Sequence, residues 1–126
     1  MGQKDPQSRR VLVADDEDAI RALVGRVLSR AGFQAVHASD GAEAIECLDA
    51  ALFDAIVLDL MMPRVDGFGV LEHLIETQPL MVEKTIILTA FPKAAVRERV
   101  HQLCGVLSKP FEFDELVSMV NECASR

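Results

Sequence analysis

The sequence has few basic residues and no long apolar run, and each shortage excludes a class of protein. Lysine and arginine number 13 against 20 aspartates and glutamates, for a formal net charge of −7. Binding to a phosphate backbone needs a basic surface, so we expect no direct contact with nucleic acid. No stretch approaches the roughly 18 apolar residues of a membrane span, and the first eight residues contain no apolar signal-peptide core. We therefore expect neither a membrane span nor a signal peptide.

Cysteine is also scarce. The three cysteines, Cys47, Cys104 and Cys123, are odd in number and show no CxxC spacing. The pair of His101 and Cys104, three residues apart, supplies too few ligands for a zinc site. We expect all three cysteines to be small, buried and reduced side chains in a cytoplasmic protein.

The chain of 126 residues is about one domain long, and 50% of its residues are hydrophobic, which suffices for one core. We expect a disordered N-terminal arm over residues 1–8 and one folded domain over residues 9–126. We expect no second catalytic or DNA-binding domain within these 126 residues.

Short apolar runs alternate with amphipathic segments along the chain. Five runs predict buried strands, at residues 11–14, 34–38, 55–58, 85–88 and 106–107. Each run is followed by apolar residues at helical spacing, and in the fourth such segment these are Val96, Val100 and Leu103. The residues expected to cap helices or form turns are Asp18, Asp40 and Asp66. The alternation predicts an α/β fold, a doubly wound five-stranded parallel sheet with five helices.

Polar residues follow four of the predicted strands, where doubly wound sheets bind their ligands. These residues are Asp15, Asp16, Asp59, Thr89 and Lys109. Three carboxylates in one crevice repel one another unless a cation neutralises them. Oxygen ligands without histidine or cysteine select a hard ion such as Mg²⁺, with Mn²⁺ as a substitute in vitro. The carboxylates and their Mg²⁺, together with the Lys109 ammonium and the Thr89 hydroxyl, indicate a site for phosphoryl transfer. In this site Asp59 would be the nucleophile.

At these residues the sequence resembles the receiver domain of two-component response regulators, and it is similar to the single-domain chemotaxis regulators. The resemblance covers residues 9 to about 124 and rests on four motifs in order. These are Val-Leu-Val-Ala-Asp15-Asp16-Glu17, Asp59-Leu-Met-Met-Pro-Arg-Val-Asp-Gly67, Leu-Thr89-Ala and Lys109-Pro110-Phe111. Asp15 and Asp59 are 44 residues apart and Asp59 and Thr89 are 30 apart, close to the usual receiver spacing. The resemblance implies a flavodoxin-like sheet with strand order 2-1-3-4-5.

The resemblance also implies a role for each site residue. Asp59 would be the phosphoacceptor. Asp16, Asp59 and the backbone carbonyl of Met61 would bind Mg²⁺, helped by Asp15 through water. The residues that would hold the phosphoryl oxygens are Thr89 and Lys109.

The implied reaction takes a phosphoryl group from a phosphohistidine on a sensor histidine kinase or a histidine phosphotransfer domain. The domain would catalyse only its own phosphorylation and dephosphorylation, and would then bind a downstream protein. Receivers tune phosphate lifetime at the positions of Met61 and Phe91. Because both residues are apolar here and cannot orient a hydrolytic water, we expect slow autodephosphorylation.

Two features depart from the common receiver pattern. Val106 stands where receivers usually carry an aromatic ring that moves with the threonine. Thr89 and Lys109 are 20 residues apart, about two fewer than usual, so the fourth helix or the loop after it should be shorter. We expect switching through a rearranged fourth helix, on a surface that includes Val106, Phe91 and Pro110. The Lys109–Pro110 peptide, by resemblance, should be cis.

Two alternatives stay open. A receiver-like interaction domain that no longer needs phosphate would be consistent with Val106 and the shortened segment. A Mg²⁺-dependent phosphohydrolase of the haloacid dehalogenase type also uses an aspartate nucleophile at a strand end. Those enzymes carry a second acid two residues after the nucleophile, where this sequence has Met61, which weakens this alternative.

Overall fold

The computed structural model describes residues 9–126, and the arm predicted over residues 1–8 lies outside the described residues. Five parallel strands form one sheet in the order β2-β1-β3-β4-β5. The strands are β1 (Arg9–Ala14), β2 (Phe33–Ala38), β3 (Ala55–Asp59), β4 (Thr85–Thr89) and β5 (Gly105–Ser108). The predicted fold class and strand order are confirmed.

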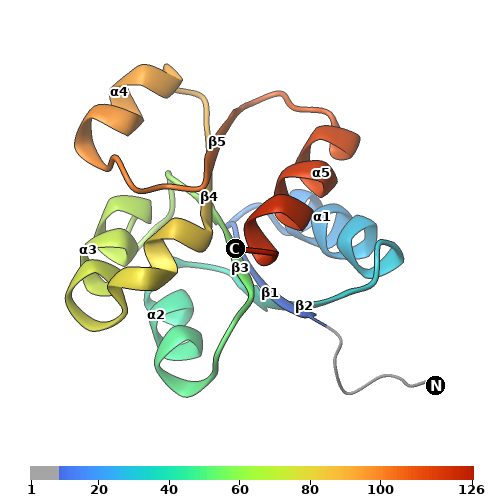
Figure 1. Cartoon of the computed structure of the whole chain (residues 1–126), viewed down its shortest axis with the longest axis horizontal. Coiled ribbons are helices and arrows are strands. Elements are labelled where there is room, and N and C mark those ends of the chain that lie inside the picture. Colours follow the sequence, from blue (N-terminus) through green and yellow to red (C-terminus); the bar gives the residue numbers. More distant parts are fainter. Residues whose placement is uncertain (1–8) are drawn as a thin grey trace.

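Helices cover both faces of the sheet (Figure 1), with α1 and α5 on one face and α2, α3 and α4 on the other. The helices are α1 (Asp18–Arg30), α2 (Gly41–Ala50), α3 (Gly67–Thr77), α4 (Lys93–Arg99) and α5 (Phe113–Ala124). A short 3-10 helix, η2 (Pro79–Lys84), precedes β4 and was not predicted. Among residues 9–126, none of the helices is both long and apolar enough to cross a membrane.

The central strand β3 is buried along its whole length, because helices cover both of its faces. Ile56 and Leu58 pack in the core on the side of α2, α3 and α4, whereas Val57 packs in the core on the side of α1 and α5. This alternation follows from the period of two in a strand. The register pairs Leu58 with Ala14, the last residue of β1, so β3 extends one residue further, to Asp59.

The start of α1 differs from the prediction. Asp18 was expected to cap the helix, but it is the first helical residue, and Glu17 occupies the cap position in an extended conformation. The backbone N–H of Glu17 donates to Oδ1 of Asp15 at 2.9 Å, which holds this turn in place. Asp18 forms an ion pair with Arg21 at 2.7 Å instead. The Asp15 carboxylate therefore holds the turn that leads into α1.

Helix α4 is shorter than its apolar spacing suggested. It ends at Arg99, before Val100 and Leu103, because Val100 turns to an extended conformation with φ −138°. Both residues are still buried, although they lie in the connection to β5. The helix has seven residues.

The prediction of three reduced cysteines is wrong, because Cys104 and Cys123 form a disulfide. Cys104 immediately precedes β5, and Cys123 lies in the last turn of α5. Helix α5 runs back along the sheet, so the Cα atoms of the pair are 5.9 Å apart despite 19 residues of separation. Cys123 is fully buried as expected. Within residues 9–126, Cys47 is the free cysteine, and it is half-buried.

Candidate functional site

Charged and polar residues gather where the carboxyl ends of β1, β3, β4 and β5 meet. Asp59 is the last residue of β3 and is 3% exposed, and Asp15 directly follows β1 and is 1% exposed. The register of β1 against β3 brings these two carboxylates side by side. Lys109 follows β5, and its backbone N–H donates to the carbonyl of Thr89 at 2.8 Å. Of the predicted residues, Asp15, Asp59, Thr89 and Lys109 are thus brought to one edge of the sheet.

The Lys109 ammonium lies among three carboxylates. Its Nζ donates to Oδ2 of Asp59 at 3.1 Å, and it lies 3.8 Å from Oδ2 of Asp15 and 3.6 Å from Oε1 of Glu17. Burial alone would lower the pKa of Lys109, but the charges of Asp59 and Asp15 outweigh it, and the pKa is raised. Lys109 therefore stays protonated and supplies one positive charge.

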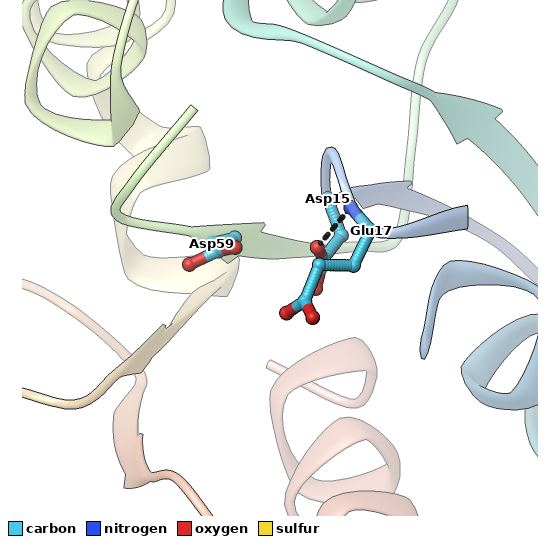
Figure 2. Close-up of side chains that lie close together, drawn as sticks. All are labelled: Asp15, Glu17 and Asp59. Carbon is cyan, nitrogen blue, oxygen red and sulfur yellow. Dashed lines mark hydrogen bonds between the residues drawn. The ribbon is translucent and has the colours of Figure 1, made fainter. Parts of the chain in front are cut away.

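Asp15, Glu17 and Asp59 form the acidic cluster of this site (Figure 2). One carboxylate oxygen from each lies within 4.8 Å of the others. Asp16 is exposed, and its side chain lies outside this group within the described part of the chain. The turn after β1, held by the hydrogen bond from the Glu17 N–H to Oδ1 of Asp15, brings both side chains to the site, where each lies near Lys109. The sequence pattern did not single out Glu17, although it is the third acid in the run that follows β1.

The Asp15 carboxyl group has a raised pKa. Burial raises its pKa to about 6, the hydrogen bond from the Glu17 N–H works against this rise, and the Asp59 charge adds to it. Within residues 9–126, its Oδ2 is buried and has no hydrogen-bond donor. A buried, unsatisfied carboxylate oxygen is costly, and a divalent cation would satisfy it. The all-oxygen donor set of the acidic cluster therefore fits Mg²⁺.

The loop between β3 and α3 is tied to the start of α2. Arg64, in the left-handed region with φ +67°, donates from Nε and Nη2 to the Asp40 carboxylate at 2.9 and 3.0 Å. The Glu43 backbone N–H also donates to Asp40 at 2.8 Å. This hydrogen bond and the Arg64 pair lower the pKa of Asp40. The carboxylates of Asp40 and Asp66 cap α2 and α3, as predicted.

The same loop packs closely against the end of β3. A Cβ atom added at Gly67 would lie 2.8 Å from the Asp59 carbonyl oxygen and from the Leu60 Cα. The Gly67 N–H donates to the Leu60 carbonyl at 2.9 Å, and the Met61 N–H donates to Oδ1 of Asp59 at 3.2 Å. Both carboxylate oxygens of Asp59 are thus held, one by the loop and the other by Lys109.

The remaining predicted residues lie around this centre. Thr89 is buried, and its hydroxyl oxygen accepts from the Phe91 N–H at 2.9 Å, which leaves its proton free to donate. Phe91 and Met61 are 49% and 61% exposed. Val106 is buried in the core. The Lys109–Pro110 peptide is cis, as the resemblance implied. Pro110 is exposed and lines a cavity of about 370 Å³ beside Lys109.

Comparison with known proteins agrees with this geometry. The family model of the response regulator receiver domain matches residues 11–121. The transcriptional regulatory protein TcrA of Mycobacterium tuberculosis is 35% identical over 93% of this chain and 46% of its own length. The response regulator MprA of Mycobacterium ulcerans is 38% identical over 94% of this chain and 51% of its own length. The chain thus spans about half the length of these curated relatives.

Solved structures agree as well. The receiver domain of the Francisella response regulator 1452 superimposes with a TM-score of 0.87 at 31% identity, covering 94% of this chain and 98% of that one. The response regulator TrrA of Thermotoga maritima, solved in complex with Mg²⁺-BeF, has a TM-score of 0.80 at 29% identity, covering 91% and 98%. Since the family model spans nearly all of the fold and the strand ends carry its acidic site, this chain belongs to the response regulator receiver domain family, the signalling modules of two-component systems.

Proposed function

We propose that the domain accepts a phosphoryl group on Asp59 in a Mg²⁺-dependent reaction, with a phosphohistidine of a histidine kinase or histidine phosphotransfer domain as donor. The observation that carries this proposal is the environment of Asp59. Its carboxylate is nearly buried, lies at the end of the central strand, and is bonded to Lys109 beside Asp15 and Glu17. Carboxylate, ammonium and hydroxyl groups in one crevice are the parts of a phosphoryl-transfer site.

In this reaction an Asp59 oxygen forms a bond to phosphorus as the P–N bond to the donor imidazole breaks, and the imidazole takes the electron pair. Bound Mg²⁺ would supply positive charge against the carboxylates and the phosphoryl oxygens. Lys109 would move its hydrogen bond from Asp59 to a phosphoryl oxygen, and the free hydroxyl proton of Thr89 would donate to another. The Met61 N–H would keep the Asp59 carboxylate oriented.

The comparisons support the proposal in two ways. The curated relatives TcrA and MprA are a transcriptional regulatory protein and a response regulator. TrrA, with the same fold, was solved with Mg²⁺-BeF. By analogy we propose that this domain responds to a histidine kinase and passes its state to a downstream protein.

The direct test is incubation of the domain with Mg²⁺ and acetyl phosphate, followed by intact mass spectrometry. We expect the mass increment of one phosphoryl group in the wild type and none in Asp59→Asn, because the amide cannot act as the nucleophile. Asp66→Asn, which keeps a cap at the start of α3 outside the acidic cluster, is the matched control and should be phosphorylated normally. An increment that persists in Asp59→Asn would place the acceptor elsewhere.

The third metal ligand is a separate question. The resemblance assigns Asp16 and the Met61 carbonyl, whereas Glu17 is the residue that the fold brings to the cluster. Glu17 already pairs with Lys109 at 3.6 Å. Following the resemblance, we expect Asp16→Asn to weaken Mg²⁺ binding by about 10–100-fold and Glu17→Gln to weaken it less. Calorimetric titration of the two variants checks this, and the reverse order would make Glu17 the ligand.

Phosphate lifetime is also testable. Met61 and Phe91 expose apolar side chains beside Asp59 and Thr89, where no polar group of theirs can orient an attacking water. We expect the phosphorylated domain to persist for minutes or longer after removal of the donor, and Met61→Asn to shorten this lifetime. The decay of the phosphorylated mass measures both, and a wild-type half-life of seconds would contradict the expectation.

The second candidate is an interaction domain that switches without phosphate. The observation in its favour is that Val106 is buried in the core and α4 has seven residues, so aromatic gating is absent at this position. For a phosphorylated domain, we propose that α4 rearranges instead. The mass experiment separates the two, because failure to incorporate phosphate would favour the interaction domain. If the structure and the affinity for a partner stay unchanged after phosphate is incorporated, the proposed rearrangement of α4 is wrong.

A further inference from the structure

The disulfide closes a ring that contains part of the phosphorylation site. Cys104 lies at the amino-terminal edge of the sheet, where its N–H donates to the carbonyl of Thr85 at 3.0 Å. From there the chain runs through β5, passes Lys109 at the opposite edge and returns along α5 to Cys123. The bond between the two cysteines therefore joins both ends of the segment that carries the lysine of the site.

The two sulfur atoms differ in access. Cys104 is half-buried, whereas Cys123 is fully buried in the core between α5 and the sheet. Their Cα separation of 5.9 Å lies within the range that a disulfide spans, so this backbone accommodates the bond. A small oxidant can thus reach Cys104 first, with Cys123 placed behind it as the second thiol.

The third cysteine provides a contrast. Burial, together with the negative charges of Glu43 and Glu46, raises the pKa of the Cys47 thiol. Because the thiolate is the reactive form, Cys47 is a poor nucleophile toward oxidants. It belongs to α2, on the other face of the sheet from Cys123. Cys47 therefore serves as an internal reference.

We propose that Cys104 and Cys123 are a reversible oxidation site for hydroperoxides, and that closure of this pair stiffens the segment carrying Lys109. The Cys104 thiolate attacks one peroxide oxygen, the O–O bond breaks, and the products are a Cys104 sulfenic acid and an alcohol or water. The Cys123 thiol then attacks the Cys104 sulfur, the S–O bond breaks, and water leaves as the disulfide forms. Two electrons pass from the thiols to the peroxide, and an external dithiol reverses the change.

The expected effect on stability follows from the length of the ring. The bond joins residues that are 19 apart in the sequence, and closing a loop of this length removes conformational entropy from the unfolded chain. For a domain of this size, reduction should lower Tm by about 10 °C. Amide hydrogen exchange should become faster in residues 105–112, while β1 and β3 stay protected.

The first experiment counts thiols. The full chain is reduced, treated with hydrogen peroxide, denatured and alkylated with iodoacetamide before intact mass measurement. We expect one adduct, mapped to Cys47, and three adducts when dithiothreitol is added before alkylation. Cys104→Ser should give two adducts under both conditions, and Cys47→Ser should still form the disulfide. Three adducts in the peroxide-treated wild type would overturn the oxidation site.

The second experiment measures stiffening on the unphosphorylated protein, so its outcome does not depend on Asp59 chemistry. Tm and hydrogen exchange are compared for oxidised and reduced wild type and for Cys104→Ser. Cys104→Ser changes the half-buried position of the pair. We expect its Tm and hydrogen exchange to match those of the reduced wild type and not to change when dithiothreitol is added. A disulfide that forms without changing Tm or exchange in residues 105–112 would overturn the effect on the Lys109 segment.

Discussion

Replacement of Lys109 by methionine is expected to slow phosphorylation of Asp59 by acetyl phosphate by about 10²–10³-fold, the cost of removing one preorganised donor from an anionic transition state. The Lys109 ammonium is 3.1 Å from the carboxylate of Asp59 and 3.8 Å from that of Asp15. Methionine retains much of the apolar length of the side chain and removes only the charge and its hydrogen bonds. Without that charge the transferring phosphoryl group loses one positively charged hydrogen-bond donor beside the acidic cluster.

The initial rate of mass increase at saturating Mg²⁺ measures this effect. Lys84→Met is the matched control, because Lys84 lies immediately before β4, at the other end of that strand from Thr89, and its Nζ donates to the Arg126 carbonyl at 2.8 Å. We expect Lys84→Met to be phosphorylated at the wild-type rate. Equal phosphorylation rates for Lys109→Met and the wild type would show that Lys109 does not contribute to the reaction.

Replacement of Asp15 by asparagine is expected to stabilise the metal-free domain while weakening Mg²⁺ binding by about 10–100-fold. Burial raises the pKa of Asp15 from 3.8 to about 6, so the folded state holds this proton more tightly than the unfolded state. As pH rises from about 4 through 6, the folded state loses stability relative to the unfolded state. Above pH 6 the full cost of the buried charge is present, and asparagine removes it.

We expect the free energy of unfolding of Asp15→Asn to exceed that of the wild type by about 1–3 kcal/mol at neutral pH, and the difference to vanish toward pH 4. Denaturant unfolding without metal, measured over a pH series, checks this. Added Mg²⁺ should stabilise the wild type and leave the variant nearly unchanged.

Asp40→Asn is the control, and its expected effect on the free energy of unfolding is opposite in sign to that of Asp15→Asn. The pKa of Asp40 is lowered by the Glu43 N–H and by Arg64, so its ionised form is favoured in the folded state. The stability that Asp40 contributes is present at neutral pH and is lost as pH falls through its folded pKa. Asn at this position should therefore reduce stability at pH 7. Stabilisation by both variants would mean that net acidic charge, rather than the burial of Asp15, sets the effect.

Most of the fold could be predicted because its signals are local. The strands read as apolar runs since both of their faces are covered, and β3 and β4 are buried along their whole length. The site could be predicted from the polar residues that follow those runs, and Asp15, Asp59, Thr89 and Lys109 do meet at one edge. The end of α4 could not be predicted, because its apolar spacing continues through the turn after Arg99.

The sequence by itself determined the order of elements, the family and the strand-end residues, because hydrophobic periodicity and motif spacing depend only on the order of residues along the chain. Only the tertiary structure decided which acids share a crevice and which cysteines meet. Glu17 faces Lys109 because of how the chain leaves β1, and Cys104 meets Cys123 because α5 returns along β5. Both depend on distances across the fold, which no local pattern encodes.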